Sequence, residues 1–289
     1  MNAARDTAVA TTPAGHLPLG EILRLSGKIS ELDISRVIVS QREGKLRFGE
    51  AAQKMGLVTW KDVELALARQ FDYPYVQDPE SGFSPLLVSA CDPFGARADI
   101  IRGLRSELSL RWFAERGKAL TVISPREDCG SSIIAANLAI AFAQLGESTL
   151  LIDADLRNPT QHEIFGIGNG DGLSSVLAGR SQIASSLNAV AGFDHLAVLC
   201  AGIIPPNPHE LLCTVNFAYL IETAPPGFDV VIVDAPPMLD YPDAQMISAR
   251  TRAVLLSARR HKTSLADLEH CKTQLAPTGC ALLGVVIND

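Results

Sequence analysis

Residues 119–145 read ALTVISPREDCGSSIIAANLAIAFAQL and contain a short apolar run, a polar loop and a longer stretch of small and apolar residues. The run ALTVIS (119–124) has the length of a β-strand, and residues 131–145 have the length of a helix. A continuous apolar run rich in β-branched residues is typical of a strand that is buried on both faces of a sheet. The segment therefore predicts a buried strand that leads through a loop into a helix.

The same alternation continues toward the C-terminus. The further apolar runs are STLLID (148–153), LAVLC (196–200), FDVVIVD (228–234), AVLLSA (253–258) and ALLGVVI (281–287). Helical stretches at 243–250 and 263–275 separate the last three runs. Because parallel strands are joined by right-handed crossovers, the alternation predicts a three-layer α/β domain with a mostly parallel sheet. Such sheets bind ligands at the carboxyl ends of their strands, so we expect the chemistry just after each run.

An internal repeat precedes this domain, since residues 18–41 match residues 47–70. The coinciding pairs are Gly20/Gly49, Glu21/Glu50, Gly27/Gly56, Asp33/Asp62 and Gln41/Gln70. Each copy indicates a short helix ended by a glycine and a second helix capped by Ser30 or Thr59. The two hairpins are expected to stack through apolar residues at helical spacing, namely Ile34, Val37, Ile38, Val63 and Leu67.

These patterns divide the chain into four parts. Residues 1–16 are expected to be a disordered N-terminus, and residues 17–76 a small all-α domain. Residues 77–95 carry three prolines and two glycines without a sustained period, which is typical of a linker. The α/β domain then occupies residues 96–289 and opens with an amphipathic helix.

Composition excludes several classes of protein. The chain has 25 basic and 32 acidic residues, a net charge of −7, and its basic residues are scattered, so no nucleic-acid partner is expected. The longest apolar stretch falls short of the ~20 residues that span a bilayer, and no secretory signal is readable. The six cysteines form no C-x-x-C pair. We therefore expect a cytoplasmic protein.

The loop after the first strand, residues 124–132, lies where a phosphate-binding loop would lie. A Walker A loop, G-x-x-x-x-G-K-S/T, uses glycines to bring backbone amides to phosphate, a lysine to neutralise charge and a hydroxyl to bind magnesium. Here Gly130 and Ser132 fit the pattern, but Ser131 stands at the lysine position. On this loop alone, a plain strand-to-helix turn is the better interpretation.

Two later loops change that interpretation. Asp153, Asp155 and Arg157 follow one strand, and Asp234 follows another. Paired aspartates at a strand end suit a hydrated magnesium ion, and a further aspartate suits the surroundings of the metal, as in Walker B motifs. Three such loops in this order indicate descent from P-loop nucleotide-binding proteins.

The chain resembles the deviant-Walker ATPases of the MinD type and, within them, bacterial tyrosine kinases of exopolysaccharide synthesis of the chain-length-determinant (EpsG-type) branch. The matching segments are LLIDADLRNP (150–159), GLSSVLAGR (172–180) and AGIIPPNPHELL (201–212). The resemblance implies a P-loop NTPase-like domain that uses ATP and Mg²⁺. It also implies a membrane polysaccharide co-polymerase as partner, which would hold the chain at the inner face of the membrane and let it regulate polymer length or export.

The resemblance also implies residue roles. Asp153 and Asp155 would be catalytic and, with Ser132 and Asp234, would hold magnesium. The implied nucleotide-binding residues are Arg126, Gly130, Ser131, Ser132, Arg157 and Asn288, of which Asn288 would contact adenine. The family's subunit-contact motif E-x-x-R-x-x-R resembles residues 99–105, which implies a homo-oligomer that uses Asp99, Arg102 and Arg105.

Ser131 leaves two interpretations open, because the family keeps lysine or arginine at this position. Loss of one electrostatic stabiliser costs about 10²–10³ in rate. Arg126 is a possible replacement source of charge. The chain is therefore either a kinase-like regulator with a degenerate phosphate loop or a catalytically inactive pseudokinase scaffold. A MinD-like positioning ATPase is a third interpretation.

The N-terminal repeat is similar to the N-terminal (MshEN-type) domain of type II secretion ATPases, which binds cyclic di-GMP through two 24-residue motifs separated by five residues. That spacing is met here by residues 18–41 and 47–70. The opening R-L-G of the motif appears as Arg47-Phe48-Gly49 in the second copy and as Pro18-Leu19-Gly20 in the first. The implied cyclic di-GMP contacts are Leu19, Gly20, Gln41, Arg47, Gly49 and Gln70. A protein-docking module is the alternative.

Overall fold

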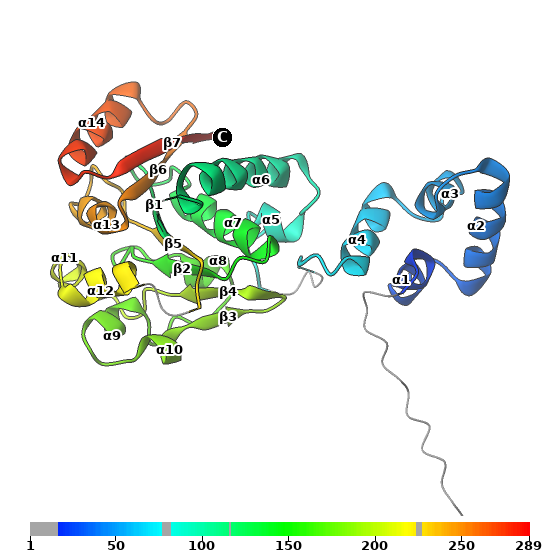
Figure 1. The fold of residues 1–289 in the computed structure, drawn as a ribbon, viewed down its shortest axis with the longest axis horizontal. Helices are drawn as coiled ribbons and strands as arrows, with labels where there is room; N and C mark the ends of the chain where they lie inside the picture. The colour runs from blue at the N-terminus through cyan, green and yellow to red at the C-terminus, as the bar shows by residue number, and fades with distance from the viewer. Residues whose placement is uncertain (1–16, 77–81, 116, 224–226) are drawn as a thin grey trace, which may run out of the picture. The chain divides into compact units, whose positions relative to one another are not determined.

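The computed structural model describes residues 17–76, 82–115, 117–223 and 227–289. The chain divides into two compact units, residues 1–74 and 75–289, drawn in Figure 1. The segment predicted to be disordered, residues 1–16, and residues 77–81 of the predicted linker lie outside the described residues. No helix in the described parts of the chain combines the length and the apolar character needed to cross a membrane.

Over its described residues, from Leu17 onward, the first unit consists of four helices that pair crosswise. They are α1 (Leu19–Leu25), α2 (Glu31–Gly44), α3 (Phe48–Lys54) and α4 (Trp60–Gln70). Helix α1 packs mainly on α4, and α2 packs mainly on α3, so each copy of the repeat buries its helices against the other copy. The shared core is built from Ile22, Leu23, Ile29, Val37, Ala51, Ala52, Val58, Val63 and Ala66.

Local signals in the repeat are confirmed by this structure. Ser30 and Thr59 cap α2 and α4, each accepting a hydrogen bond from a backbone amide 3.2 Å away. Gly27 and Gly56 have φ of 72° and 69°, the left-handed region that favours glycine. The predicted seam is wrong at Ile38, which is 38% exposed. Its neighbour Val37 points into the core, and successive residues on a helix are about 100° apart.

The described residues of the second unit form a seven-stranded sheet in the order β3-β4-β2-β5-β1-β6-β7. The strands are β1 (Ala119–Ile123), β2 (Thr149–Asp153), β3 (Asn188–Val190), β4 (Phe193–Leu199), β5 (Val230–Asp234), β6 (Ala253–Arg259) and β7 (Ala281–Asn288). Only the β3–β4 pair is antiparallel within this sheet. The six predicted strands are all present, and the short edge strand β3 was not predicted.

Helices cover both faces of the sheet, as Figure 1 shows. One face carries α5 (Val88–Cys91), α6 (Ala96–Leu108), α7 (Ser131–Gln144) and α8 (Gln161–Ile164), and a π-helical turn (Ser109–Phe113) continues α6. The other face carries α9 (Leu173–Leu177), α11 (Pro208–Leu212), α12 (Val215–Thr223), α13 (Asp243–Thr251) and α14 (Leu265–Leu275). Two further short helices are α10 (Ile183–Ser186) and a 3₁₀ turn (Ala276–Thr278). The predicted three-layer α/β architecture is confirmed.

The structure differs from the predicted linker over its described residues. Leu87 and Ala90, within or beside α5, are 0% exposed and belong to the core of the second unit. The side chain of Asn137 on α7 accepts a hydrogen bond from the Ser89 amide at 2.9 Å and donates one to the Leu86 carbonyl at 3.0 Å. The proline-rich segment is therefore anchored to the sheet domain, which begins at Tyr75 rather than at residue 96.

Candidate functional site

The loop between β1 and α7 ends in a glycine that the geometry requires. Gly130 has φ of 75°, and a Cβ atom at this position would lie 2.8 Å from Nδ2 of Asn288. Helix α7 begins at the next residue and runs for 14 residues. The free backbone amides of its first turn face the loop and favour an anion there.

A cavity of about 520 Å³ adjoins this loop and the ends of β2 and β5. It is lined by Ser84, Leu86, Ser124, Glu127, Asp128, Gly130, Ser131, Ser132, Ile133, Asp155, Asn158, Thr160, Glu163, Ile164, Ala235 and Pro237. Four of these side chains are carboxylates, and none of these described lining residues is lysine, arginine or histidine. A volume of this size suits a small ligand, but the walls supply no cation to a phosphate chain.

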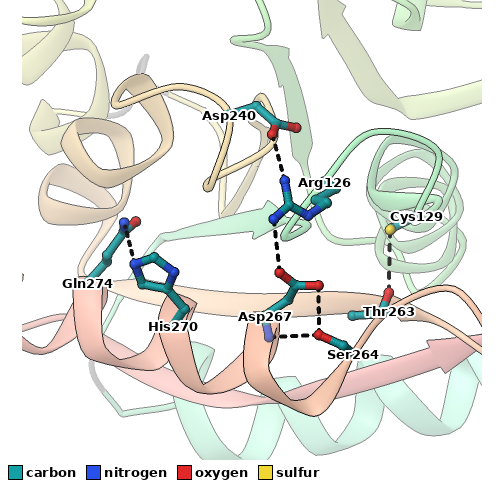
Figure 2. Close-up of polar contacts among 8 residues, drawn as sticks. All are labelled: Arg126, Cys129, Asp240, Thr263, Ser264, Asp267, His270 and Gln274. Carbon is teal, nitrogen blue, oxygen red and sulfur yellow. Dashed lines mark hydrogen bonds and ion pairs between the residues drawn. The ribbon is translucent and has the colours of Figure 1, made fainter.

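Arg126 is directed elsewhere, as Figure 2 shows. Its guanidinium donates to Oδ1 of Asp240 at 3.3 Å and to Oδ1 of Asp267 at 3.1 Å. The pKa of Asp267 is lowered, first by the hydrogen bond from Ser264 and further by Arg126. Arg126 is absent from the described residues that line the cavity, so the structure does not bring it to the predicted phosphate position.

Ser131 and Ser132 both line the cavity. The Ser131 hydroxyl donates to the hydroxyl of Ser124 at 3.3 Å, which ties the lysine position of the motif to the end of β1. The Ser132 carbonyl accepts a hydrogen bond from Nε2 of Gln161 at 3.1 Å. These two residues lie where the motif predicts, at the first turn of α7.

Asp153 ends β2 and is fully buried. Its Oδ2 atom accepts from the amides of Thr160 and Gln161 at 3.1 and 3.0 Å, and Oδ1 accepts from the amide of Asp155 at 3.3 Å. Burial and the neighbouring Asp234 raise the pKa of Asp153 well above its ordinary value. A buried carboxyl group with a raised pKa is poised to hold a proton or a cation.

Asp234 ends β5 directly beside Asp153, with which it pairs in the sheet register. Its Oδ2 atom accepts from Nε2 of Gln161 at 2.7 Å, whereas Oδ1 is buried without a hydrogen-bond partner among the described residues. Burial raises the pKa of Asp234 to about 7, against the opposing hydrogen bonds from the side chains of Gln161 and Ser132. An orphaned buried carboxyl oxygen is a position that a cation or its bound water would satisfy.

Asp155 reaches the cavity, and Arg157 does not. Oδ1 of Asp155 accepts from the amides of Arg157 and Asn158 at 3.0 and 2.9 Å, and burial raises the pKa of Asp155. The Arg157 guanidinium instead donates to Oδ2 of Asp243 at 2.6 Å and lies 4.6 Å from the ring centre of Tyr241. The residues that line the cavity do not include Arg157, and the nucleotide contact implied for it stays a prediction.

The oxygen atoms of Ser132 and of the three aspartates fit a hydrated magnesium ion better than they fit a triphosphate without a metal. Within the described residues, no three His, Cys, Asp or Glu side chains form a ready ligand cluster. Magnesium retains several waters and needs only one or two direct protein oxygens. The Ser132 hydroxyl and Asp155 would supply these oxygens, and Asp153 and Asp234 would bind its waters. The phosphates of a nucleotide would find backbone amides at α7 but no basic side chain.

Asn288 contacts the loop itself. Its Nδ2 atom donates to the Cys129 carbonyl at 2.9 Å and to the Ser257 hydroxyl at 3.1 Å. It also lines a second cavity of about 570 Å³ between α6, α7 and β7, whose walls are mostly apolar. The adenine contact implied for Asn288 stays a prediction, and the structure gives the residue a role in holding the loop.

The predicted subunit-contact residues lie on α6. Arg102 donates to the Pro93 carbonyl and to Oδ1 of Asp99, and Arg105 donates to the Ala141 carbonyl at 3.1 Å. Asp99 is 67% exposed, whereas Arg102 and Arg105 are half-buried. Both arginines are therefore tied to their own chain, and contact with a second subunit stays a prediction.

The residues implied for cyclic di-GMP have packing roles in the first unit. A Cβ atom at Gly20 would lie 2.8 Å from the ring of Phe48, and one at Gly49 would lie 2.6 Å from Cγ1 of Val63. Gln70 donates to the Leu17 carbonyl at 3.2 Å. Leu19 and Gln41 are half-buried, and Arg47 is exposed at the N-terminus of α3. Close helix packing accounts for the repeated glycines, and second-messenger binding stays a prediction.

Two residues of the site were not predicted from the sequence. Gln161 bridges α7 and β5 by donating from one nitrogen to the Ser132 carbonyl and to Asp234. Asp243 is buried and accepts a hydrogen bond from the guanidinium of Arg157. Both act through contacts between segments far apart in the chain, and no local pattern marks them.

Comparison with known proteins identifies the family of this chain. No family model matches the chain. The chain is 32% identical to the putative tyrosine-protein kinase CapB of Staphylococcus aureus over 209 residues, which are 72% of this chain and 91% of CapB. It is 33% identical to the tyrosine-protein kinase Wzc of Salmonella typhi over 204 residues, which are 70% of this chain and 28% of Wzc.

Solved structures agree with this placement. The kinase domain of Escherichia coli tyrosine kinase ETK matches with a TM-score of 0.68 at 29% identity, covering 74% of this chain and 83% of that chain. The MinD protein of Pyrococcus horikoshii, solved with Mg-ADP, matches with a TM-score of 0.52 at 20% identity over 60% of this chain and 70% of that chain, which shows the fold alone. The chain therefore belongs to the bacterial tyrosine-protein kinases, whose kinase domain has a MinD-like P-loop fold.

Proposed function

We propose that this chain is the kinase-family subunit of an exopolysaccharide export machine, that it binds a nucleotide together with Mg²⁺, and that unaided it transfers phosphate only slowly. The observation that carries the proposal is the cavity beside Gly130. Its walls combine the N-terminus of α7 and the buried Asp155 with a complete absence of basic side chains among the described lining residues, and the buried Asp153 and Asp234 end the two strands beside it. Phosphoryl transfer depends almost entirely on such positive charge.

Kinetics and binding of three proteins test the phosphate loop. Mg-ATP affinity by calorimetry and ATP turnover are compared for the natural chain, Ser131→Lys and Arg126→Ala. Ser131→Lys is expected to raise turnover about 10²-fold or more, because it restores one transition-state cation. Arg126→Ala is the matched control and is expected to leave both quantities unchanged, since Arg126 is held by Asp240 and Asp267. Turnover by the natural chain at the rate of Ser131→Lys, or its loss in Arg126→Ala, would contradict the proposal.

The partner in this proposal is a membrane polysaccharide co-polymerase. Support comes from the resemblance to the chain-length-determinant branch and from the length of Wzc, of which the chain matches only 28%. The chain would then lie at the cytoplasmic face of the membrane. Fractionation of cells that produce the chain with and without the co-polymerase tests this location. The chain is expected in the membrane fraction only when the co-polymerase is present, and equal fractionation in both strains would refute the partnership.

A pseudokinase scaffold is the second candidate, and the two ion pairs of Arg126 favour it, because they leave the only arginine of the loop unavailable to phosphate. The two candidates differ in nucleotide binding. A scaffold that still binds the co-polymerase but gives no heat with Mg-ATP, while Ser131→Lys does, would replace the proposed function by this second one.

A further inference from the structure

A thiol, an imidazole and a buried carboxylate form a relay on the far side of Asp243 from Arg157. Nδ1 of His209 lies 2.7 Å from Oδ1 of Asp243, and Nε2 of the same ring lies 3.7 Å from Sγ of Cys213. The three residues come from α11, from the residue that follows it and from the first turn of α13. This cluster lies outside the cavity described above.

The contact with Asp243 decides which ring nitrogen of His209 carries the hydrogen. The side chain of Asp243 is 1% exposed, and its second oxygen accepts from Arg157, so a carboxylate faces Nδ1 and can only accept a proton from it. The neutral imidazole then carries its hydrogen on Nδ1 and offers the lone pair of Nε2 to the thiol. A nucleophile beside a base that a third group orients is the arrangement found in covalent catalysis.

Cys213 differs from the other cysteines of the chain. It is exposed, whereas Cys129, Cys200 and Cys271 are buried and Cys91 and Cys280 are half-buried. Burial and the carboxylates of Asp243 and Glu210 raise the pKa of the Cys213 thiol, so it reacts poorly without a base to take its proton. His209 occupies the position of that base.

We propose that Cys213 is a modification site whose thiol His209 and Asp243 activate for exchange with low-molecular-weight disulfides. Nε2 of His209 takes the thiol proton, and the sulfur attacks one sulfur of the disulfide. A new S–S bond forms as the old one breaks, and the leaving sulfur departs with the electron pair and receives the proton from His209. Cys213 is oxidised to a mixed disulfide, and the other half of the reagent is reduced to a thiol.

Thiol titration of the reduced, folded full-length chain with dithiobis(nitrobenzoate), an aromatic disulfide, tests the proposal. One thiol per chain is expected to react in a fast phase, which Cys213→Ser removes and the control Cys280→Ser retains. His209→Gln is expected to slow that phase about tenfold or more, the range of general-base catalysis. The matched control is His270→Gln, because His270 also pairs with the residue four positions later, Gln274.

A second readout is independent of the kinetics. Mass spectrometry of the native chain after incubation with glutathione disulfide is expected to find the adduct on the peptide that contains Cys213. A fast phase that survives Cys213→Ser, a rate that His209→Gln leaves within twofold of the natural chain while its unfolding transition is normal, or an adduct on another cysteine would overturn the proposal.

Discussion

Gly130 precedes the first residue of α7, and Gly146 lies just beyond its end. The two glycines have similar φ angles but different surroundings. Their φ values are 75° and 90°, and only Gly130 has a side chain, Asn288, within reach of an added Cβ. Alanine at either position is expected to cost about 1 kcal/mol in the free energy of unfolding because of the left-handed backbone. Gly130→Ala must also displace Asn288 from two hydrogen bonds, at roughly 0.5–1.5 kcal/mol each. Urea unfolding measures the difference, and equal losses for the two variants would contradict it.

The raised pKa of Asp234 gives stability a specific pH dependence in magnesium-free buffer. The native carboxyl group holds its proton up to a pKa of about 7, whereas the ordinary value is 3.8. Between these values the native state binds more protons than the unfolded chain, so the free energy of unfolding falls as pH rises, by at most about 1.4 kcal/mol per unit for one group. The stability that Asp234 contributes is fully present below pH 3.8, and it is lost as the pH rises through about 7.

Asp234→Asn tests this sign. The variant has no charge to bury, so it is expected to exceed the stability of the natural chain already at pH about 5, and by a larger margin at pH about 8. Urea unfolding at both values provides the comparison, and added Mg²⁺ is expected to restore the natural chain at the higher pH. The prediction is wrong if the natural chain becomes more stable, relative to the variant, when the pH is raised.

Part of the site was predictable residue by residue. Asp153, Asp155 and Asp234 follow apolar runs in the sequence, and parallel strands bring their carboxyl ends to one edge. The direction of Arg126 was not predictable, because Asp240 and Asp267 lie more than a hundred positions away in the chain. The long arginine side chain can adopt several rotamers on the same backbone. Which rotamer forms depends on carboxylates that the fold brings near, here Asp240 and Asp267.

At the scale of elements, α7 organises the second unit because Asn137, a buried polar side chain in its middle, holds the segment that carries α5. Asn137→Leu would leave the Ser89 amide and the Leu86 carbonyl without their partner, at about 1–3 kcal/mol for each group that stays buried. We expect a less stable second unit and faster proteolysis between residues 83 and 95. The control is Asn216→Leu, which removes one hydrogen bond from an exposed asparagine to the Leu177 carbonyl. Equal protease sensitivity of both variants would refute the anchoring role.

The strands and long helices were predictable from local sequence. Each strand is a continuous apolar run, and each long helix carries apolar residues at helical spacing. The runs at 119–124 and 253–258 became β1 and β6 within one residue. The segment 83–95 has no periodic pattern of its own, and it is ordered by contacts with distant residues: Leu87 and Ala90 pack into the core of the second unit, and Asn137, some fifty residues away in sequence, binds its backbone. Strand β3 has three residues, which is too short for any period to appear.

At the scale of the whole molecule, the two units have separate cores and separate fluorescent reporters. The chain has two tryptophans, Trp60 in the first unit and Trp112 in the second, where its indole donates to the Ala119 carbonyl at 2.9 Å. Leu23→Ala removes a fully buried side chain from the first core, which costs about 2–5 kcal/mol. The transition seen by Trp60 is expected to move to lower urea, and the transition seen by Trp112 is expected to stay. Chains with only one tryptophan separate the signals, and parallel shifts would show that the units unfold together.

The crosswise pairing of α1 with α4 and of α2 with α3 bears on how the first unit forms and how it arose. Each 24-residue copy has the main packing partners of its helices in the other copy, so neither hairpin is expected to be stable before the other has been made. Folding of this unit is therefore expected to be a single step that waits until residue 70 has left the ribosome. For the same reason, an ancestor with one copy would be expected to pair with a second molecule of itself, an arrangement that a duplication would join into one chain.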